Sequence, residues 1–293
     1  MRKLFLALLI LVGAVHPAFA KVNVVATLPW IGSVVKEIGG DKIDVTTLVK
    51  SNQDPHMIEA KPSMLLAGRK ADILMFNGLD LEIGYLPLIM EKAQNPAIVP
   101  GKPGNFDCSQ YIAVLEKPLT PDRSMGDVHP LGNPHYHFSP INILHVARGM
   151  TSILAEIDEA NADYYKANLK KFAARMDEHK QVWSAAPLNG KKFIAYHRLF
   201  EYLASDFGFK IIGYVEPKPG IPPSAAYVQK LAESMKTSKP DAIITTAYYG
   251  KHESEALAER TGSKIIALPH DVGSMPGTED WFAFMDKVLS LLR

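Results

Sequence analysis

Three histidines and one aspartate stand where a chain of alternating strands and helices collects its ligands. Each lies just after a predicted apolar strand or just before a predicted helix. The four residues are His56, His135, His197 and Asp271. Ligands of parallel sheets bind outside the carboxyl ends of the strands. We therefore predict that these four side chains converge in a cleft, two from each half of the chain.

Three imidazoles and one carboxylate suit a borderline-soft divalent ion, and tetrahedral nitrogen and oxygen coordination favours Zn²⁺. Mn²⁺ prefers more oxygen ligands. Four protein ligands leave no open position for a catalytic water, so the set favours binding over hydrolysis. The intervals of 79, 62 and 74 residues form no compact motif. Position alone therefore leaves open a second interpretation, in which each histidine is a hydrogen-bonded structural residue.

The elements that must position these residues alternate between strand and helix. Strands are predicted at Val22–Thr27, Ile43–Val49, Asp72–Phe76, Lys192–Tyr196, Lys210–Val215, Ala242–Thr246 and Lys264–Leu268. Helices are predicted at Ile31–Ile38, Ser63–Ala67, Leu199–Asp206, Ala226–Met235, Glu253–Arg260 and Trp281–Leu292. Such alternation implies parallel sheets with helices on both faces.

Two segments interrupt the alternation. Residues 101–134 are rich in Pro, Gly and Asp and predict a long loop with one short strand at Tyr111–Val114. Ser139 and Pro140 then mark a helix start. From Glu159 to Ala186 the chain has no Gly or Pro, and its apolar residues recur at helical steps.

A solitary helix of this length predicts a bridge between two lobes. The expected fold class is α/β: two lobes, each with a mainly parallel sheet flanked by helices, joined by one long rigid backbone helix. We expect a signal peptide at residues 1–20, an N-terminal lobe at 21–158, the linking helix at 159–187 and a C-terminal lobe at 188–293.

The first twenty residues have the pattern of a secretory signal. Arg2 and Lys3 precede an apolar run from Leu4 to Val15, and Ala18-Phe19-Ala20 resembles a cleavage site. The run is shorter than the roughly 20 residues that span a bilayer, although an N-terminal anchor helix is the alternative. We expect export to the periplasm with cleavage after about Ala20.

The net charge of the mature chain gives no electrostatic attraction that would favour binding of nucleic acid. Without Arg2 and Lys3, the 32 basic residues fall to 30 against 31 acidic ones, a net charge of −1. A composition that is 47% hydrophobic and 22% charged indicates a folded globular chain. Cys108 is the single cysteine, which rules out an internal disulfide; we expect a half-buried structural thiol, with a metal ligand as the alternative.

Several motifs resemble the metal-binding proteins of ABC importers for zinc and manganese. They are Asp54-Pro55-His56-Met57-Ile58-Glu59, Asn77-Gly78-Leu79-Asp80-Leu81-Glu82, Gly132-Asn133-Pro134-His135, Tyr196-His197-Arg198-Leu199-Phe200-Glu201-Tyr202, and Asp271 before the last helix. The likeness covers essentially the whole mature chain and keeps the order of the motifs. It implies two α/β lobes joined by a long helix.

The resemblance also implies a site and a role. It makes His56, His135, His197 and Asp271 the metal ligands. A histidine at 197 is typical of zinc members, whereas manganese members tend to carry a carboxylate there. The implied function is capture of Zn²⁺ and delivery to an ABC permease of the inner membrane, with Mn²⁺ or mixed binding as the alternative. We expect a monomer that is not an enzyme; a periplasmic metallochaperone is a further candidate partner.

The chain departs from the family pattern at two places. His137 stands where the family usually has an aromatic residue, and the long His- and acid-rich loop of many zinc members is replaced by a segment with only His129. Two interpretations are open for both histidines: low-affinity collectors that pass metal to the main site, or solvated loop residues. Glu59 is expected either to hydrogen-bond a ligand imidazole or to lie at the surface. The other histidines are expected to be structural, with His270 facing away from the ion.

The residues alone leave three other functions open. A zinc hydrolase would need an open coordination position and a general base, for which Glu59 is the candidate. A binding protein for an iron chelate or corrinoid would share the two-lobed shape without needing the four ligands. Adhesion is a third possibility that no feature of the sequence favours.

Overall fold

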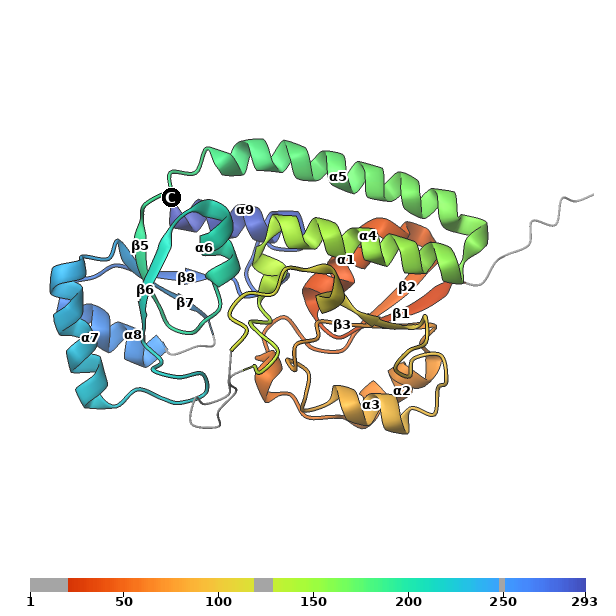
Figure 1. The fold of residues 1–293 in the computed structure, drawn as a ribbon, viewed down its shortest axis with the longest axis horizontal. Coiled ribbons are helices and arrows are strands. Elements are labelled where there is room, and N and C mark those ends of the chain that lie inside the picture. The colour runs from red at the N-terminus through yellow and green to blue at the C-terminus, as the bar shows by residue number, and fades with distance from the viewer. Residues whose placement is uncertain (1–20, 119–128, 248–250) are drawn as a thin grey trace, which may run out of the picture.

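The computed structural model describes residues 21–118, 129–247 and 251–293. The predicted signal peptide lies outside the described residues. Two four-stranded sheets, all of whose strands run parallel, make two lobes that lie side by side (Figure 1). The expected fold class is confirmed.

The first lobe has the strand order β2-β1-β3-β4. Its strands are β1 Val22–Ala26, β2 Ile43–Thr47, β3 Ile73–Phe76 and β4 Asn105–Asp107, and its helices are α1 Pro29–Gly39, α2 Pro62–Lys70, α3 Leu86–Lys92 and α4 Pro140–Ile157. Every residue of β3 is buried, as expected for a strand covered on both faces. The Ser139 hydroxyl accepts from the Asn142 amide and caps α4, as its sequence predicts.

The second lobe repeats the arrangement as β6-β5-β7-β8. Its strands are β5 Lys192–Ala195, β6 Lys210–Tyr214, β7 Ala242–Thr246 and β8 Ile265–Leu268, and its helices are α6 Glu201–Phe207, α7 Ala225–Ser238, α8 Lys251–Thr261 and α9 Trp281–Leu292. In each sheet the strand that comes first in the chain, β1 or β5, lies between two later strands. The chain therefore adds strands on both sides of it, and the direction of winding reverses at that strand. This is the switch point at which such sheets bind ligands.

The long bridging helix is shorter than predicted. A 3-10 turn occupies Glu159–Asn161, and α5 runs over the 23 residues Ala162–Ser184, about 34 Å at 1.5 Å per residue. It crosses above both lobes, beside α4 and α9 (Figure 1). The Arg175 guanidinium in α5 pairs with Glu37 of α1 at 2.8 Å and with Asp280 at the start of α9 at 3.0 Å. One side chain thus links the bridge to both lobes.

The two lobes also share one hydrophobic core. The largest cluster of buried apolar residues contains Val24 from β1, Phe172 from α5, Phe193 from β5 and Phe284 from α9. A core packed through both lobes resists their rigid-body separation, because closely packed interiors tolerate little displacement. Within the described ranges, no helix combines the length and apolar character needed to cross a membrane.

The strand predicted at Tyr111–Val114 is wrong. Cys108–Tyr111 forms a 3-10 turn, and the edge strand beside β3 is β4, at Asn105–Asp107. Only Phe106 of its three residues is buried. So short a strand presents no alternation that a sequence pattern can reveal.

Candidate metal site

Three predicted ligands meet between the lobes. His56 lies in the 3-10 turn Pro55–Met57 that follows β2, His135 directly precedes the 3-10 turn Tyr136–Phe138, and His197 comes two residues after β5. The ring centroid of His56 is 5.2 Å from that of His135 and 5.5 Å from that of His197, and the last two are 5.5 Å apart. The structure therefore brings one imidazole of the second lobe against two of the first.

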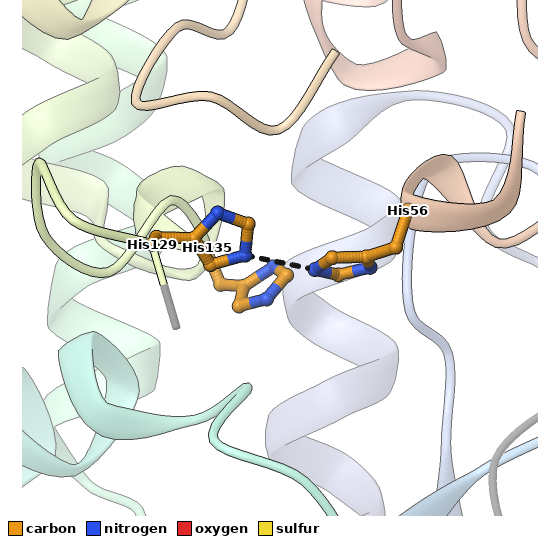
Figure 2. A group of neighbouring side chains, drawn as sticks. All are labelled: His56, His129 and His135. Atoms are coloured by element: carbon orange, nitrogen blue, oxygen red, sulfur yellow. Dashed lines mark hydrogen bonds between the residues drawn. The ribbon is translucent and has the colours of Figure 1, made fainter. Parts of the chain in front are cut away.

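A fourth imidazole, that of His129, lies in the same cluster. Its Nε2 is 3.1 Å from Nε2 of His56 (Figure 2). One ring nitrogen each of His56, His129 and His135 falls within 4.8 Å of the others. Two nitrogens bound tetrahedrally to one zinc at 2.0–2.1 Å would be about 3.4 Å apart. His129 is half-buried at the site, so the expectation of a solvated loop residue is wrong for it.

Asp271 lies in the wall of an adjoining cavity of about 20 Å³, together with His135, His137 and His270. Its carboxyl is buried, and Oδ1 accepts from the Val272 amide at 2.7 Å. Burial raises the pKa of Asp271 to about 8. Its oxygens are not in the close cluster of ring nitrogens that the described residues form.

Two carboxylates orient the clustered imidazoles. Asp54 Oδ1 lies 2.8 Å from Nδ1 of His56, and Glu216 Oε2 lies 2.6 Å from Nδ1 of His197. Each bond orients the ring through Nδ1, which is how carboxylates commonly support histidine ligands. Glu59, expected either to bond a ligand imidazole or to lie at the surface, is exposed. Glu216 directly follows the strand predicted at Lys210–Val215, so the strand-end rule could have found it.

Burial favours the neutral form of two of the clustered rings, those of His129 and His135. It lowers the pKa of His129 to about 3, with the neighbouring imidazoles of His56 and His197 adding to the effect. The pKa of His135 falls well below its ordinary value for the same causes. Its Nε2 is buried and has no hydrogen-bond partner among the described residues. A buried neutral imidazole with an idle nitrogen is ready to accept a metal ion.

His137 is part of the core rather than a solvated residue or an exposed collector. It stacks between Trp30 and Phe284, with ring centroids 6.3 and 5.9 Å away. Its Nε2 lies 2.8 Å from the carbonyl oxygen of His270. His270, expected to face away from the ion, is itself buried in the wall of the cavity that holds Asp271.

The remaining candidates lie outside this cluster. Cys108 is fully buried rather than half-buried, and burial raises the pKa of its thiol well above its ordinary value. His145 and His252 are exposed. His179 bonds Asp286 of α9 with its Nδ1 at 3.0 Å.

Glu82 supports the first-lobe side of the site. Its carboxyl accepts from the Thr27 hydroxyl at 2.7 Å and from the backbone amides of Asn77 and Gly78 at 2.6 and 3.1 Å. Asn77 in turn donates to the carbonyl of Pro134 at 3.0 Å, one residue before His135. The buried carboxyl thus ties the ends of two central strands to a ligand segment.

Two α/β lobes share one core, and imidazoles from both lobes meet in an arrangement that could hold a metal ion. The family model described as zinc-uptake complex component A, periplasmic (ZnuA), matches residues 24–293. The chain belongs to this family, as the sequence motifs suggested.

Relatives within this group carry different metals in their names. The chain is 25% identical over 251 residues to the iron ABC transporter substrate-binding lipoprotein MtsA of Streptococcus pyogenes serotype M1, covering 84% of this chain and 79% of the relative. It is 23% identical over 273 residues to the manganese lipoprotein PsaA of Streptococcus mitis, covering 90% and 86%. It is 25% identical over 259 residues to the high-affinity zinc uptake protein ZnuA of Bacillus subtilis (strain 168), covering 88% and 79%.

A crystal structure of ZnuA superposes with a TM-score of 0.76 at 25% identity, covering 93% of this chain and 98% of that one. The family is one of substrate-binding proteins for metal ABC importers, which work with a membrane permease and ATPase. Such proteins bind and deliver an ion and are not enzymes.

Proposed function

We propose that the mature chain captures Zn²⁺ with His56, His135, His197 and Asp271 and hands it to the permease of an ABC importer. The observation that carries the proposal is the meeting of three imidazoles, two from one lobe and one from the other, with centroids 5.2–5.5 Å apart. Two of these rings are aimed by carboxylates through Nδ1. Such support is typical of metal-binding histidines.

Zinc is preferred over manganese because of the donor types. Imidazole nitrogen suits Zn²⁺, whereas Mn²⁺ favours carboxylate, carbonyl and water oxygen. The names of the relatives do not decide the metal, since one is named for iron, one for manganese and one for zinc. Manganese or mixed binding by the same class of protein is the alternative.

Asp271 is proposed as the fourth ligand on electrostatic grounds. The buried carboxyl of Asp271 has its pKa raised to about 8, and no cationic side chain of the described residues acts to lower it. A dication bound beside it would compensate the charge of the carboxylate. The carboxylate would halve the net charge of +2 that the three neutral imidazoles leave on the ion. Binding would therefore expel the proton of Asp271.

His129 is proposed as the entry ligand, which is the collector role in a specific form. It lines, with His135 and His197, a cavity of about 370 Å³, whereas Asp271 lines a separate, smaller cavity. An ion arriving through this cavity would meet His129 together with His56 and His135. It would then exchange His129 for Asp271 as it settles between the lobes.

Export and handover complete the proposal. Residues 1–20 act as a signal peptide cleaved after about Ala20, and the mature chain works in the periplasm as a monomer that docks on its permease. A periplasmic metallochaperone is a candidate loading partner. Because one core runs through both lobes, release is proposed to depend on movement of the ligand-bearing loops rather than on wide opening of the lobes.

The first test is competitive titration of zinc and manganese on the metal-stripped mature protein and on His197→Ala. Tight one-to-one zinc binding that collapses in the variant, with much weaker manganese binding, is expected. Equal or tighter manganese binding would overturn the choice of metal. The absence of tight binding of either ion would overturn the site itself.

The entry role has its own test by stopped-flow loading. His129→Ala should slow zinc uptake and leave the equilibrium affinity nearly unchanged, while the exposed His145→Ala serves as the matched control. A large loss of equilibrium affinity in His129→Ala would make His129 a permanent ligand instead.

A further inference from the structure

A buried asparagine joins the two ligand-bearing segments across the lobe boundary. Asn133 is 5% exposed and precedes His135 by two residues. Its Oδ1 accepts from the His135 backbone amide at 2.9 Å. Its Nδ2 donates to the backbone carbonyl of Arg198 at 3.0 Å, directly after His197. The side-chain amide of Asn133 therefore bonds both the backbone of His135 in the first lobe and the backbone next to His197 in the second lobe.

The same asparagine is held at its backbone. Its carbonyl accepts from the hydroxyl of Tyr202 in α6 at 2.8 Å, and that hydroxyl accepts in turn from the Leu115 amide at 3.0 Å. The Asn133 amide donates to the Leu115 carbonyl at 2.9 Å. Tyr202 is 3% exposed, and the bond from its hydroxyl to the Asn133 carbonyl is buried. Two stretches of the first lobe are thus tied to one helix of the second.

Charged groups around the amide reinforce the connection. Asn133 Nδ2 is also 3.0 Å from Glu116 Oε2 and 3.4 Å from Glu201 Oε2. Glu116 comes from the first lobe and pairs with Arg198 Nη1 of the second at 2.6 Å. The amide donors of Asn133 therefore face acceptors from both lobes.

We propose that Asn133, together with Tyr202, forms an interlobe clasp that sets how fast the bound metal ion leaves. The proposal rests on the proposed function and adds the residue that controls release. An ion held by His135 and His197 leaves only when one ligand segment moves away from the other. That movement separates residues 133–135 from Arg198 and Tyr202. It must break the partly buried bond from Asn133 Nδ2 to the Arg198 carbonyl and the buried bond from the Tyr202 hydroxyl to the Asn133 carbonyl. A buried donor left without its acceptor is costly, so the clasp opposes the motion.

The clasp makes Asn133 a positioning residue rather than a ligand. Asn133→Ala should accelerate zinc dissociation about tenfold or more, the change that corresponds to about 1.4 kcal/mol. Tyr202→Phe, which removes only a hydroxyl, should accelerate dissociation in the same direction by a smaller factor.

The matched controls make equivalent bonds inside one lobe. Asn95 Nδ2 donates to the carbonyls of Gly68 and Ala71 at 2.8 and 2.7 Å, and its Oδ1 accepts from the Ala97 amide at 3.0 Å. The Tyr227 hydroxyl donates to the Tyr214 carbonyl at 2.8 Å within the second lobe. Asn95→Ala and Tyr227→Phe should lose comparable hydrogen bonds and leave the dissociation rate of zinc unchanged.

The experiment measures zinc dissociation into excess chelator for the mature protein and the four variants, with the melting temperature of each metal-free protein alongside. Faster release in Asn133→Ala and Tyr202→Phe alone, at melting temperatures like those of their controls, is the expected result. Dissociation rates in Asn133→Ala and Asn95→Ala that agree within twofold would overturn the clasp while leaving the proposed function intact.

Hydrogen exchange on the metal-free proteins keeps the two proposals apart. Asn133→Ala should expose the His135 amide, whose acceptor it removes, and Tyr202→Phe should expose the Leu115 amide. A wild-type protein that binds no metal would overturn the proposed function. Unchanged protection of both amides would overturn the clasp whether or not the protein binds zinc.

Discussion

Zinc binding at neutral pH should release a proton from Asp271. The pKa of this buried carboxyl is raised to about 8, so at pH 7 about 0.9 of the molecules carry the proton. A zinc ligand must be deprotonated, and the ion therefore displaces that proton. His129, whose pKa is lowered to about 3, has no proton to lose on becoming a ligand at this pH. The count of released protons thus distinguishes the two candidates for the fourth position.

The substitution Asp271→Asn removes the titrating carboxyl. Calorimetric titration of zinc in buffers of different ionisation enthalpy then measures how many protons each protein releases. The wild-type protein should release about 0.9 more protons per zinc than the variant at pH 7, and about 0.1 more at pH 9. Its affinity should rise about tenfold from pH 6 to pH 7 through this group alone and level off above pH 8. The sign follows from the raised pKa, because protons compete for the carboxyl only below about pH 8.

The control is Asp206→Asn. Burial also raises the pKa of Asp206, but its carboxyl accepts from the Ser139 hydroxyl at 2.7 Å rather than facing the cleft. This variant should match the wild-type proton count. Equal proton release and equal affinity in wild-type and Asp271→Asn proteins would refute the reasoning and make His129 the fourth ligand.

Three further predictions concern the residues behind the site. Glu216→Gln should lower zinc affinity about 10–100-fold by releasing the ring of His197; an unchanged affinity, measured by competition, would show that the 2.6 Å bond does not orient the ligand. Glu82, with its pKa raised to about 7, stabilises the fold below about pH 4.5 and loses that contribution as pH rises through 7. The unfolding free energy of the wild type relative to Glu82→Gln should therefore fall by about 2–3 kcal/mol between pH 5 and pH 8 in denaturant titrations, and a flat difference would contradict the raised pKa. Ser139→Ala should cost about 1 kcal/mol in unfolding free energy by removing the cap on the Asn142 amide; no change in the midpoint would mean that water replaces the cap.

Much of the architecture was predictable because it depends on local patterns. Apolar runs such as Ala242–Thr246 are buried along their whole length and predict strands covered on both faces. The absence of Gly and Pro over 159–186 predicts a long helix, although the 3-10 turn at Glu159–Asn161 shortens α5. The edge strand β4 escaped prediction because three residues paired to β3 leave no periodic signal.

The site was predictable only in part. His56, His135 and His197 follow from strand ends and motifs, because the carboxyl ends of parallel strands share one edge of each sheet. His129 does not, since it lies in the predicted 101–134 loop, away from any strand end or helix start, and its contact with His56 spans 73 residues. His137 was misjudged for a related reason: its place between Trp30 and Phe284 is set by helices that are distant in sequence.

Three features can be read from the sequence alone: the alternation of strands and helices, the division into two similar α/β halves, and the residue types available for a divalent ion. These depend on hydrophobic periodicity and on turn chemistry, which act over a few residues. Tertiary structure decided which polar groups support the ligands and how the lobes are joined. The bonds of Glu216 to His197 and of Asn133 to Arg198 arise only when the lobes pack on a common core. Such contacts follow from the relative placement of whole elements, which no local pattern encodes.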